Sequence, residues 1–174
     1  MTTENPYAAP VTDPTVASPV DAPLHLATLG QRFGGALIDA LINMAIIFPL
    51  SFAMGFYSTR AGHKLSLMET TGMGLAGFAI FLAIHWVFLN ATGQTIGKKV
   101  AKTRIVTMDG RKPGMGDLAG KRYAFMNLIG IIPLAGSILS LVNILFIFRN
   151  DRRCLHDLIA GTQVVQVTPG QPIV

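Results

Sequence analysis

Residues 33–57 read FGGALIDALINMAIIFPLSFAMGFY and contain one charged side chain, Asp39. As an α-helix this stretch is about 37 Å long, enough to cross the roughly 30 Å hydrocarbon layer of a membrane. Residues 72–90, GMGLAGFAIFLAIHWVFLN, contain no Asp, Glu, Lys or Arg and give a helix of about 28 Å. We therefore predict two transmembrane helices, with Pro49 as a candidate kink in the first.

The composition of the whole chain agrees with these two stretches. Its 174 residues are 51% hydrophobic and 13% charged, with a mean hydropathy of +0.49, whereas a soluble domain has about 25% charged residues. The single cysteine, Cys154, cannot form an internal disulfide, and no Cys/His spacing indicates a zinc site. These features exclude a disulfide-stapled secreted protein and a zinc module, and they argue against a free cytosolic enzyme.

The ends of the chain differ from its middle. Residues 1–27 contain five prolines, no Lys or Arg and few large apolar side chains, so we predict a disordered cytoplasmic tail. They lack the basic and apolar regions of a signal peptide. The membrane domain is predicted to span residues 28–167, followed by a short C-terminal tail over 168–174.

A third apolar region, AFMNLIGIIPLAGSILSLVNILFIF, covers residues 124–148, and Pro133 and Gly136 divide it into two short pieces. It crosses a membrane twice, crosses it once, or enters and leaves on the same side. A re-entrant backbone at membrane depth needs a covering of protein.

The distribution of basic residues predicts the orientation. The loop between the first two helices holds two basic residues, whereas residues 98–122 hold eight, which places the second stretch and the N-terminus in the cytoplasm. A single crossing by residues 124–148 would put Arg149, Arg152 and Arg153 outside. The positive-inside rule therefore favours a helical hairpin, either as two crossings or as a re-entrant loop.

Two short segments predict a small β element at the cytoplasmic surface. Residues 102–106 alternate polar and apolar side chains before the turn pair Asp109–Gly110, which indicates a β-hairpin or an extended loop. Residues 162–167 have the pattern of a strand that follows a short helix. The predicted fold is an all-α polytopic membrane protein with this small β element.

One polar stripe on the first helix is a candidate site. Asp39 lies seven residues after Arg32 and four before Asn43, so the three share one helix face. A carboxylate inside a spanning helix costs about 2.5–3.5 kcal/mol and usually faces a bundle interior or a cavity. Asp39 is therefore either an ion- or proton-binding residue or a hydrogen-bonded core residue.

Two further residues belong to the candidate site. Asp157 is expected at the same end as Arg32, where the two would form an ion pair that ties the C-terminal segment to the first helix. His85 lies in the second helix and titrates near neutral pH when unperturbed. It is either a proton relay or a packing residue.

Several short motifs follow one another along the chain: Arg32 and Asp39 in the first helix, GQTIGK at 93–98, TRIV at 103–106, DG at 109–110 and HDLIAGT at 156–162. Together they resemble the RDD family of small prokaryotic membrane proteins, named for one arginine and two aspartates. The resemblance covers about residues 25–167 and matches Arg32, Asp39 and Asp157 to those three residues. It implies a membrane protein of a family with mostly unknown function, in which small-solute transport is suspected and sodium–proton exchange is reported for some members.

Two functions remain open at this stage. The first is a small cation/proton antiporter or related transporter that acts as an oligomer, with Asp39 binding the ion or proton and Arg32 and Asp157 holding the cytoplasmic end. The second is a non-catalytic scaffold or accessory subunit of another membrane complex. We expect no enzymatic activity, cofactor, metal or nucleic-acid partner. The basic stretch 98–122 is expected to contact anionic lipids of the inner membrane.

Overall fold

The computed structural model describes residues 24–53, 66–132 and 135–167. The predictions for residues 1–23 and 168–174 and for Pro133 lie outside these residues, as do Arg60 and Lys64 of the first loop.

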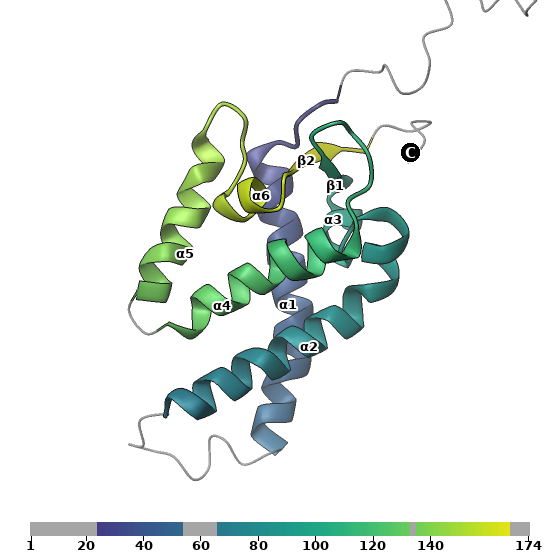
Figure 1. Ribbon diagram of the computed structural model, residues 1–174. Coiled ribbons are helices and arrows are strands. Elements are labelled where there is room, and N and C mark those ends of the chain that lie inside the picture. The colour runs from purple at the N-terminus through teal and green to yellow at the C-terminus, as the bar shows by residue number, and fades with distance from the viewer. Residues whose placement is uncertain (1–23, 54–65, 133–134, 168–174) are drawn as a thin grey trace, which may run out of the picture.

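Two long helices, α1 (Leu29–Ala53) and α2 (Leu67–Thr92), run through the molecule (Figure 1). Both are long and apolar enough to cross a membrane, which confirms the two predicted apolar helices. Each begins a few residues earlier than predicted. For α2 the reason is Ser66, which forms a capping box with Glu69 and so starts the helix at Leu67. Most of their apolar side chains, such as Phe33 and Phe52, point away from the rest of the protein.

A small cap covers one end of α1. It contains the short helices α3 (Ile96–Val100) and α6 (Leu155–Ile159) and the strands β1 (Thr103–Thr107) and β2 (Thr162–Gln166). The strands pair antiparallel, with Ile105 opposite Val164. The predicted strand near 162–167 is therefore confirmed. A local hairpin is wrong, because the partner of β1 comes from the other end of the domain.

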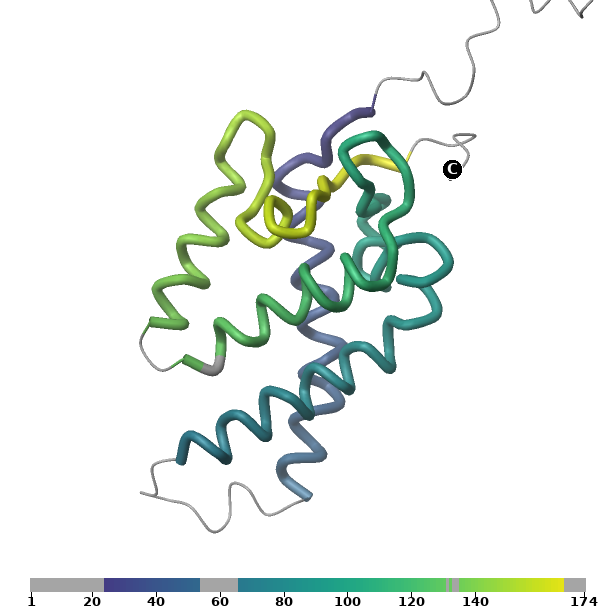
Figure 2. Tube along the Cα trace, viewed as in Figure 1, coloured from purple at the N-terminus to yellow at the C-terminus, as the bar shows by residue number. Residues whose placement is uncertain are grey.

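The boundary of the predicted tail also needs correction. Ala27 is fully buried, its N–H donates to the carbonyl of Val164 at 3.0 Å, and Leu26 forms a bridge with Val165. Residues 24–27 thus extend the small sheet rather than belong to a disordered tail. The first and last described segments consequently lie side by side at the cap (Figure 2).

The third apolar region forms a helical hairpin. A π-helix, η2 (Gly116–Ala124), continues into α4 (Phe125–Ile131), and α5 (Ala135–Leu145) runs back toward the cap and ends in the 3₁₀ turn η3 (Phe146–Phe148). The predicted break near Gly136 is confirmed. One straight helix through this region is excluded, since α5 returns the chain to the end that holds β1. The end of α4 and the start of α5 lie level with the middle part of α1 (Figure 1).

The bend depends on a close backbone contact. A Cβ atom at Gly136 would lie 2.2 Å from the carbonyl oxygen of Ile129, so glycine alone allows α5 to start so near α4. A Cβ atom at Gly130, inside α4, would have no atom within 4 Å outside the backbone of its own helix. The two glycines therefore differ in what a methyl group would meet.

Gly136→Ala should destabilise the folded protein by about 1–3 kcal/mol, because the methyl group forces the backbones of α4 and α5 apart. The matched change Gly130→Ala should be neutral or stabilise α4 by up to about 1 kcal/mol, since alanine is the better helix former. The measurement is thermal unfolding of each variant in the same detergent. Equal melting temperatures for the two variants would contradict the close packing at Gly136.

Candidate functional site

The carboxylate of Asp157 joins three segments that are far apart in the sequence. Arg32, in the first turn of α1, donates from Nη2 to Asp157 Oδ2 at 2.5 Å. Arg122, in η2, donates from Nη1 to Asp157 Oδ1 and to the hydroxyl of Thr162 in β2. The expected pairing of Arg32 with Asp157 is therefore present, and Arg122 is a second partner that the sequence analysis missed.

Local structure fixes the direction of this carboxylate. Asp157 lies in the first turn of α6, where Oδ2 also accepts the backbone N–H of Cys154 at 3.0 Å. The side chain is completely buried, and that of Arg122 is 3% exposed. Burial by itself raises the pKa of Asp157, but the positive charge of Arg122 and the other neighbouring groups outweigh it and hold that pKa well below its usual range.

Asp39 forms a second polar centre deeper along α1. Its Oδ2 accepts the hydroxyl of Thr95 at 2.5 Å, and its Oδ1 accepts the backbone N–H of Gly97 at 2.7 Å. Thr95 is the N-cap of α3 and also accepts the N–H of Lys98. A Cβ atom at Gly97 would lie 2.1 Å from the carbonyl oxygen of Gly35, so α3 rests directly on the backbone of α1.

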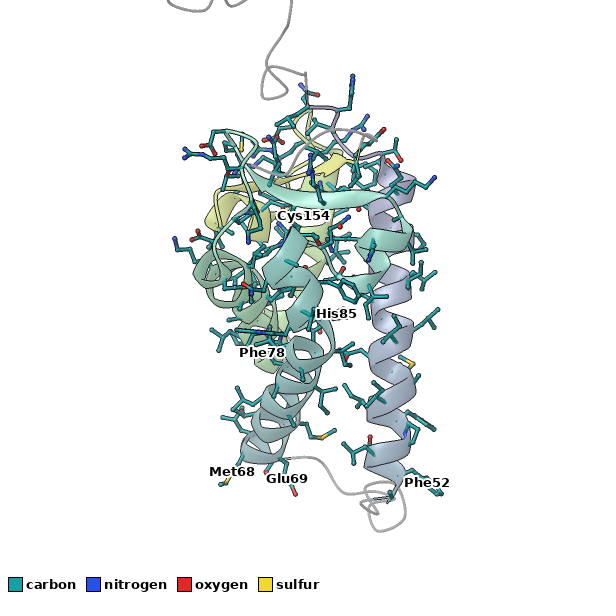
Figure 3. The ribbon with its side chains drawn as sticks, turned by 90° about the vertical axis from the view of Figure 1, so that its right-hand side faces the viewer. Phe52, Met68, Glu69, Phe78, His85 and Cys154 are labelled. Atoms are coloured by element: carbon teal, nitrogen blue, oxygen red, sulfur yellow. The ribbon has the colours of Figure 1, made fainter. Side chains whose placement is uncertain are left out.

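Two more ionisable groups face Asp39. His85 Nε2 lies 3.7 Å from Asp39 Oδ1, and Lys98 Nζ lies 3.9 Å from Asp39 Oδ2. The Nδ1 atom of His85 accepts the N–H of Ile96 at 3.2 Å, which leaves the proton of a neutral ring on Nε2. That atom is buried and has no hydrogen-bond partner among the described residues. Figure 3 shows His85 below the cap that holds Cys154 and far from Phe52 at the other end.

The stripe predicted on α1 is divided between these centres. Arg32 belongs to the group around Asp157, which we call the Asp157 centre. Asp39 belongs to the group that it forms with Thr95, Gly97, His85 and Lys98, which we call the Asp39 centre. Asn43 is half-buried, and its Oδ1 atom is buried without a hydrogen-bond partner among the described residues. The structure thus brings Asp39 and His85 together and Arg32 and Asp157 together, and it leaves Asn43 in neither hydrogen-bonded group.

The basic stretch 98–122 differs from its predicted arrangement. Lys98, Arg104 and Arg122 are largely buried and are not part of an exposed basic loop. The exposed basic residues of this stretch are Lys99, Lys102, Arg111, Lys112 and Lys121. The GQTIGK motif at 93–98 was the available signal for the Asp39 centre, because it supplies Thr95, Gly97 and Lys98.

Cys154, His156 and Asp157 lie close enough together to be considered as metal ligands, with donor atoms within 4.8 Å of one another. Asp157 is already held by two guanidinium groups, and burial raises the pKa of the Cys154 thiol. The His156 ring bonds through Nδ1 to Asn143 Oδ1 at 2.8 Å. The positive charges of Arg32 and Arg122 repel a dication, so this grouping fits a metal ion poorly.

Comparison with known proteins gives one family and two relatives. The sequence model of the RDD family matches residues 26–161. The uncharacterized protein YckC of Bacillus subtilis (strain 168) is 38% identical over 141 residues, which cover 80% of this chain and 84% of that protein. An uncharacterized protein of Haemophilus influenzae is 24% identical over 144 residues, covering 82% of this chain and 80% of the relative. No solved structure matches.

Asp157→Asn should destabilise the protein by about 3–5 kcal/mol, because it leaves Arg32 and Arg122 without their buried counter-charge. The matched control is Asp109→Asn, which removes an exposed pair with Arg111 and should change the melting temperature little. Thermal unfolding in detergent measures both variants. A small effect at Asp157, equal to that at Asp109, would show that the buried centre does not hold the cap.

The lowered pKa of the buried His156 should make the stability of the protein depend on pH. Burial and the nearby charge of Arg122 lower its pKa from 6.5 to about 3. Between these values the unfolded chain binds a proton that the folded chain does not, so stability should fall as the pH drops from 6.5 toward 3, by up to about 1.4 kcal/mol per pH unit. The loss from Asp157 begins at a lower pH, near the ordinary carboxyl pKa of about 3.9, because there the unfolded chain starts to bind a proton that the folded chain does not.

The measurement is the melting temperature between pH 7.5 and 4.5 for the wild type and for His156→Gln. The variant should show a flatter profile over this range, since its side chain does not titrate. Parallel profiles would contradict a buried, neutral His156.

Proposed function

The chain belongs to the RDD family, and from this premise we propose that it is a multi-pass inner-membrane protein that exchanges protons for a small cation at Asp39. The observation that carries the proposal is the group formed by Asp39 and His85, which lie on the apolar helices α1 and α2, and Lys98 of α3. Both relatives are uncharacterized proteins, so the proposal rests on the geometry of the site.

The exposed surface of α1 and α2 supports a membrane location. The core helix of a soluble protein is mostly buried, whereas only 6% and 11% of the most apolar windows of α1 and α2 are buried inside the protein. Apolar surface of this extent is unfavourable in water and favourable in lipid.

The remaining elements support the proposed orientation. The cap carries the exposed basic residues of stretch 98–122, which the positive-inside rule places in the cytoplasm. The α5 helix has 11 residues, about 16 Å, against a hydrocarbon layer of roughly 30 Å. We therefore propose that α4 and α5 form a re-entrant hairpin that enters from the cytoplasmic side, with α2 packed against α4 as its covering.

The Asp39 group has the parts that proton transfer needs. The imidazole of His85 and the amine of Lys98 each lie within 4 Å of the carboxylate of Asp39. The Nε2 of His85, which has no hydrogen-bond partner among the described residues, lies 3.7 Å from Asp39 Oδ1. A cation that displaces a proton from this group would couple the two movements.

The size of the chain adds a requirement. Transporters that expose one site alternately to each side usually contain paired repeats, and the sequence shows no internal repeat. The proposed exchange therefore needs two or more copies, and we propose a homo-oligomer that assembles through the exposed faces of the long helices.

The alternative function is a non-catalytic scaffold or accessory subunit, and one observation favours it. Both carboxylate oxygens of Asp39 already accept hydrogen bonds, from Thr95 and Gly97, which tie α3 to α1. A structural role for Asp39 would explain this arrangement without any ion. The two functions differ in what a neutral side chain of the same shape would do.

Asp39→Asn should abolish sodium-, lithium- or potassium-driven proton movement in proteoliposomes, because the amide cannot carry the proton. It should leave the protein inserted and folded, since Asn can still accept the N–H of Gly97. The measurement compares pH changes inside vesicles with matched amounts of reconstituted protein. His85→Gln tests the relay in the same assay and should slow the exchange.

The matched control is Asp151→Asn, which changes an exposed aspartate paired with Arg149 and should keep full exchange. No exchange by correctly oriented wild-type protein would contradict the transport proposal. In that case co-purification of a second membrane protein, together with a lower abundance of Asp39→Asn, would favour the scaffold.

A further inference from the structure

A cavity of about 540 Å³ lies between α1 and the α5–η3 segment, next to the cap. Its α1 wall consists of Phe33, Ala36, Leu37 and Ala40, which share one helix face. Its opposite wall consists of Ile144, Ile147 and Phe148. Most of these side chains are exposed, so the cavity opens along the same apolar surface that α1 and α5 present to their surroundings.

Three basic residues, Arg32, Lys98 and Arg122, line the inner end of this cavity, and its described lining includes no acidic side chain. The carboxylates that balance them are Asp39 and Asp157, which lie behind the lining. Three cations against two carboxylates leave one positive charge. A charge in such an apolar setting is unfavourable without a counter-ion.

These cations also keep unused hydrogen-bond donors. Arg32 contacts Asp157 through Nη2 alone, which leaves its Nη1 and Nε without a partner among the described residues. Arg122 Nε is buried and likewise unpartnered within the described chain. Lys98 Nζ is 3.9 Å from Asp39, too far for a hydrogen bond. The inner end of the cavity can therefore donate to an anion.

We propose that this cavity binds one anionic phospholipid of the leaflet on the cap side. An acyl chain lies between the walls of α1 and α5, and the phosphate lies near Arg32 and Lys98. The site combines what such a lipid requires: an apolar slot that opens toward the hydrocarbon layer and a cationic end at the level of the cap. Its volume is in the range of pockets that hold small molecules.

A second copy of the chain fits this cavity less well. A helix with its side chains is about 10–12 Å across, so 540 Å³ holds only about one helical turn. The helices of a second copy would also bring apolar side chains, not an anion, to the three basic residues. The oligomer proposed above therefore needs a different face of the molecule.

This inference rests on the membrane location in the proposed function but not on transport. Lipid binding and ion exchange are measured separately, so the failure of one is distinguishable from the failure of the other. A chain that fractionates without membranes would contradict both proposals.

The test is native mass spectrometry of detergent-purified protein titrated with palmitoyl-oleoyl phosphatidylglycerol or with the zwitterionic phosphatidylcholine of the same chains. The wild type should bind one phosphatidylglycerol at saturation, at least tenfold more tightly than phosphatidylcholine. Lys98→Gln should reduce this preference to less than threefold, because it removes one of the three cations.

Ala40→Phe should weaken phosphatidylglycerol binding at least tenfold, because the ring fills the slot. The matched control is Ala45→Phe, the same change on an exposed position of α1 outside the lining, and it should bind as the wild type does. Equal binding of the two lipids, unchanged binding by Ala40→Phe, or no saturable lipid would overturn the proposal. So would a lipid-free dimer that Ala40→Phe disrupts.

A second measurement covers the case in which Ala40→Phe fails to fold. In a Trp86→Phe background, Ile144→Trp places a fluorophore on the α5 wall. Phosphatidylglycerol with brominated acyl chains should quench the fluorescence of this tryptophan at one lipid per protein. As the control, Leu75→Trp places the tryptophan at an exposed position of α2. The same lipid should quench its fluorescence only at high ratios of lipid to protein. Equal quenching at the two positions would overturn the proposal.

Discussion

The rest of the structure depends on the carboxylate of Asp157 and its two arginines. Arg32 comes from the start of α1 and Arg122 from η2, while Asp157 itself caps α6. Because all three groups are buried, none can exchange its partner for water, and the loss of one would leave an uncompensated charge. This constraint places the C-terminal segment on α1 and brings β2 to the position where it pairs with β1. It thereby defines the cap.

Asp39 repeats this arrangement one level deeper, with a different outcome. It receives a hydroxyl and a backbone N–H instead of two guanidinium groups, so α3 is joined to α1 by hydrogen bonds around a carboxylate. The nearby His85 and Lys98 are partners that can gain or lose a proton, whereas the arginines at Asp157 cannot. The first centre is suited to holding the fold, and the second is the one at which we propose that a proton is exchanged.

The helical hairpin links these polar centres to the apolar surroundings. Gly136 lets α5 start against α4, and α5 then returns to the cap, where Asn143 accepts hydrogen bonds from His156 in α6. Because α5 reaches the cap at a distance from α1, the apolar cavity is left between them, with the basic residues of both centres at its inner end. The same pairs that secure the fold thus shape the proposed lipid site.

The sequence by itself determined the local features of this protein: two apolar helices, the break near Gly136, and extended segments at 102–106 and 162–167. It also indicated the pairing of Arg32 with Asp157, because the charge distribution places both residues at the same end of the molecule. Helix length, apolar content and strand alternation are properties of neighbouring residues, which is why they can be read from the chain. Only the tertiary structure decided the partner of β1, the inward direction of Arg122 and the contact of Lys98 with Asp39. These depend on segments far apart in the sequence, and an arginine destined for a buried ion pair has the same local pattern as one on a surface loop.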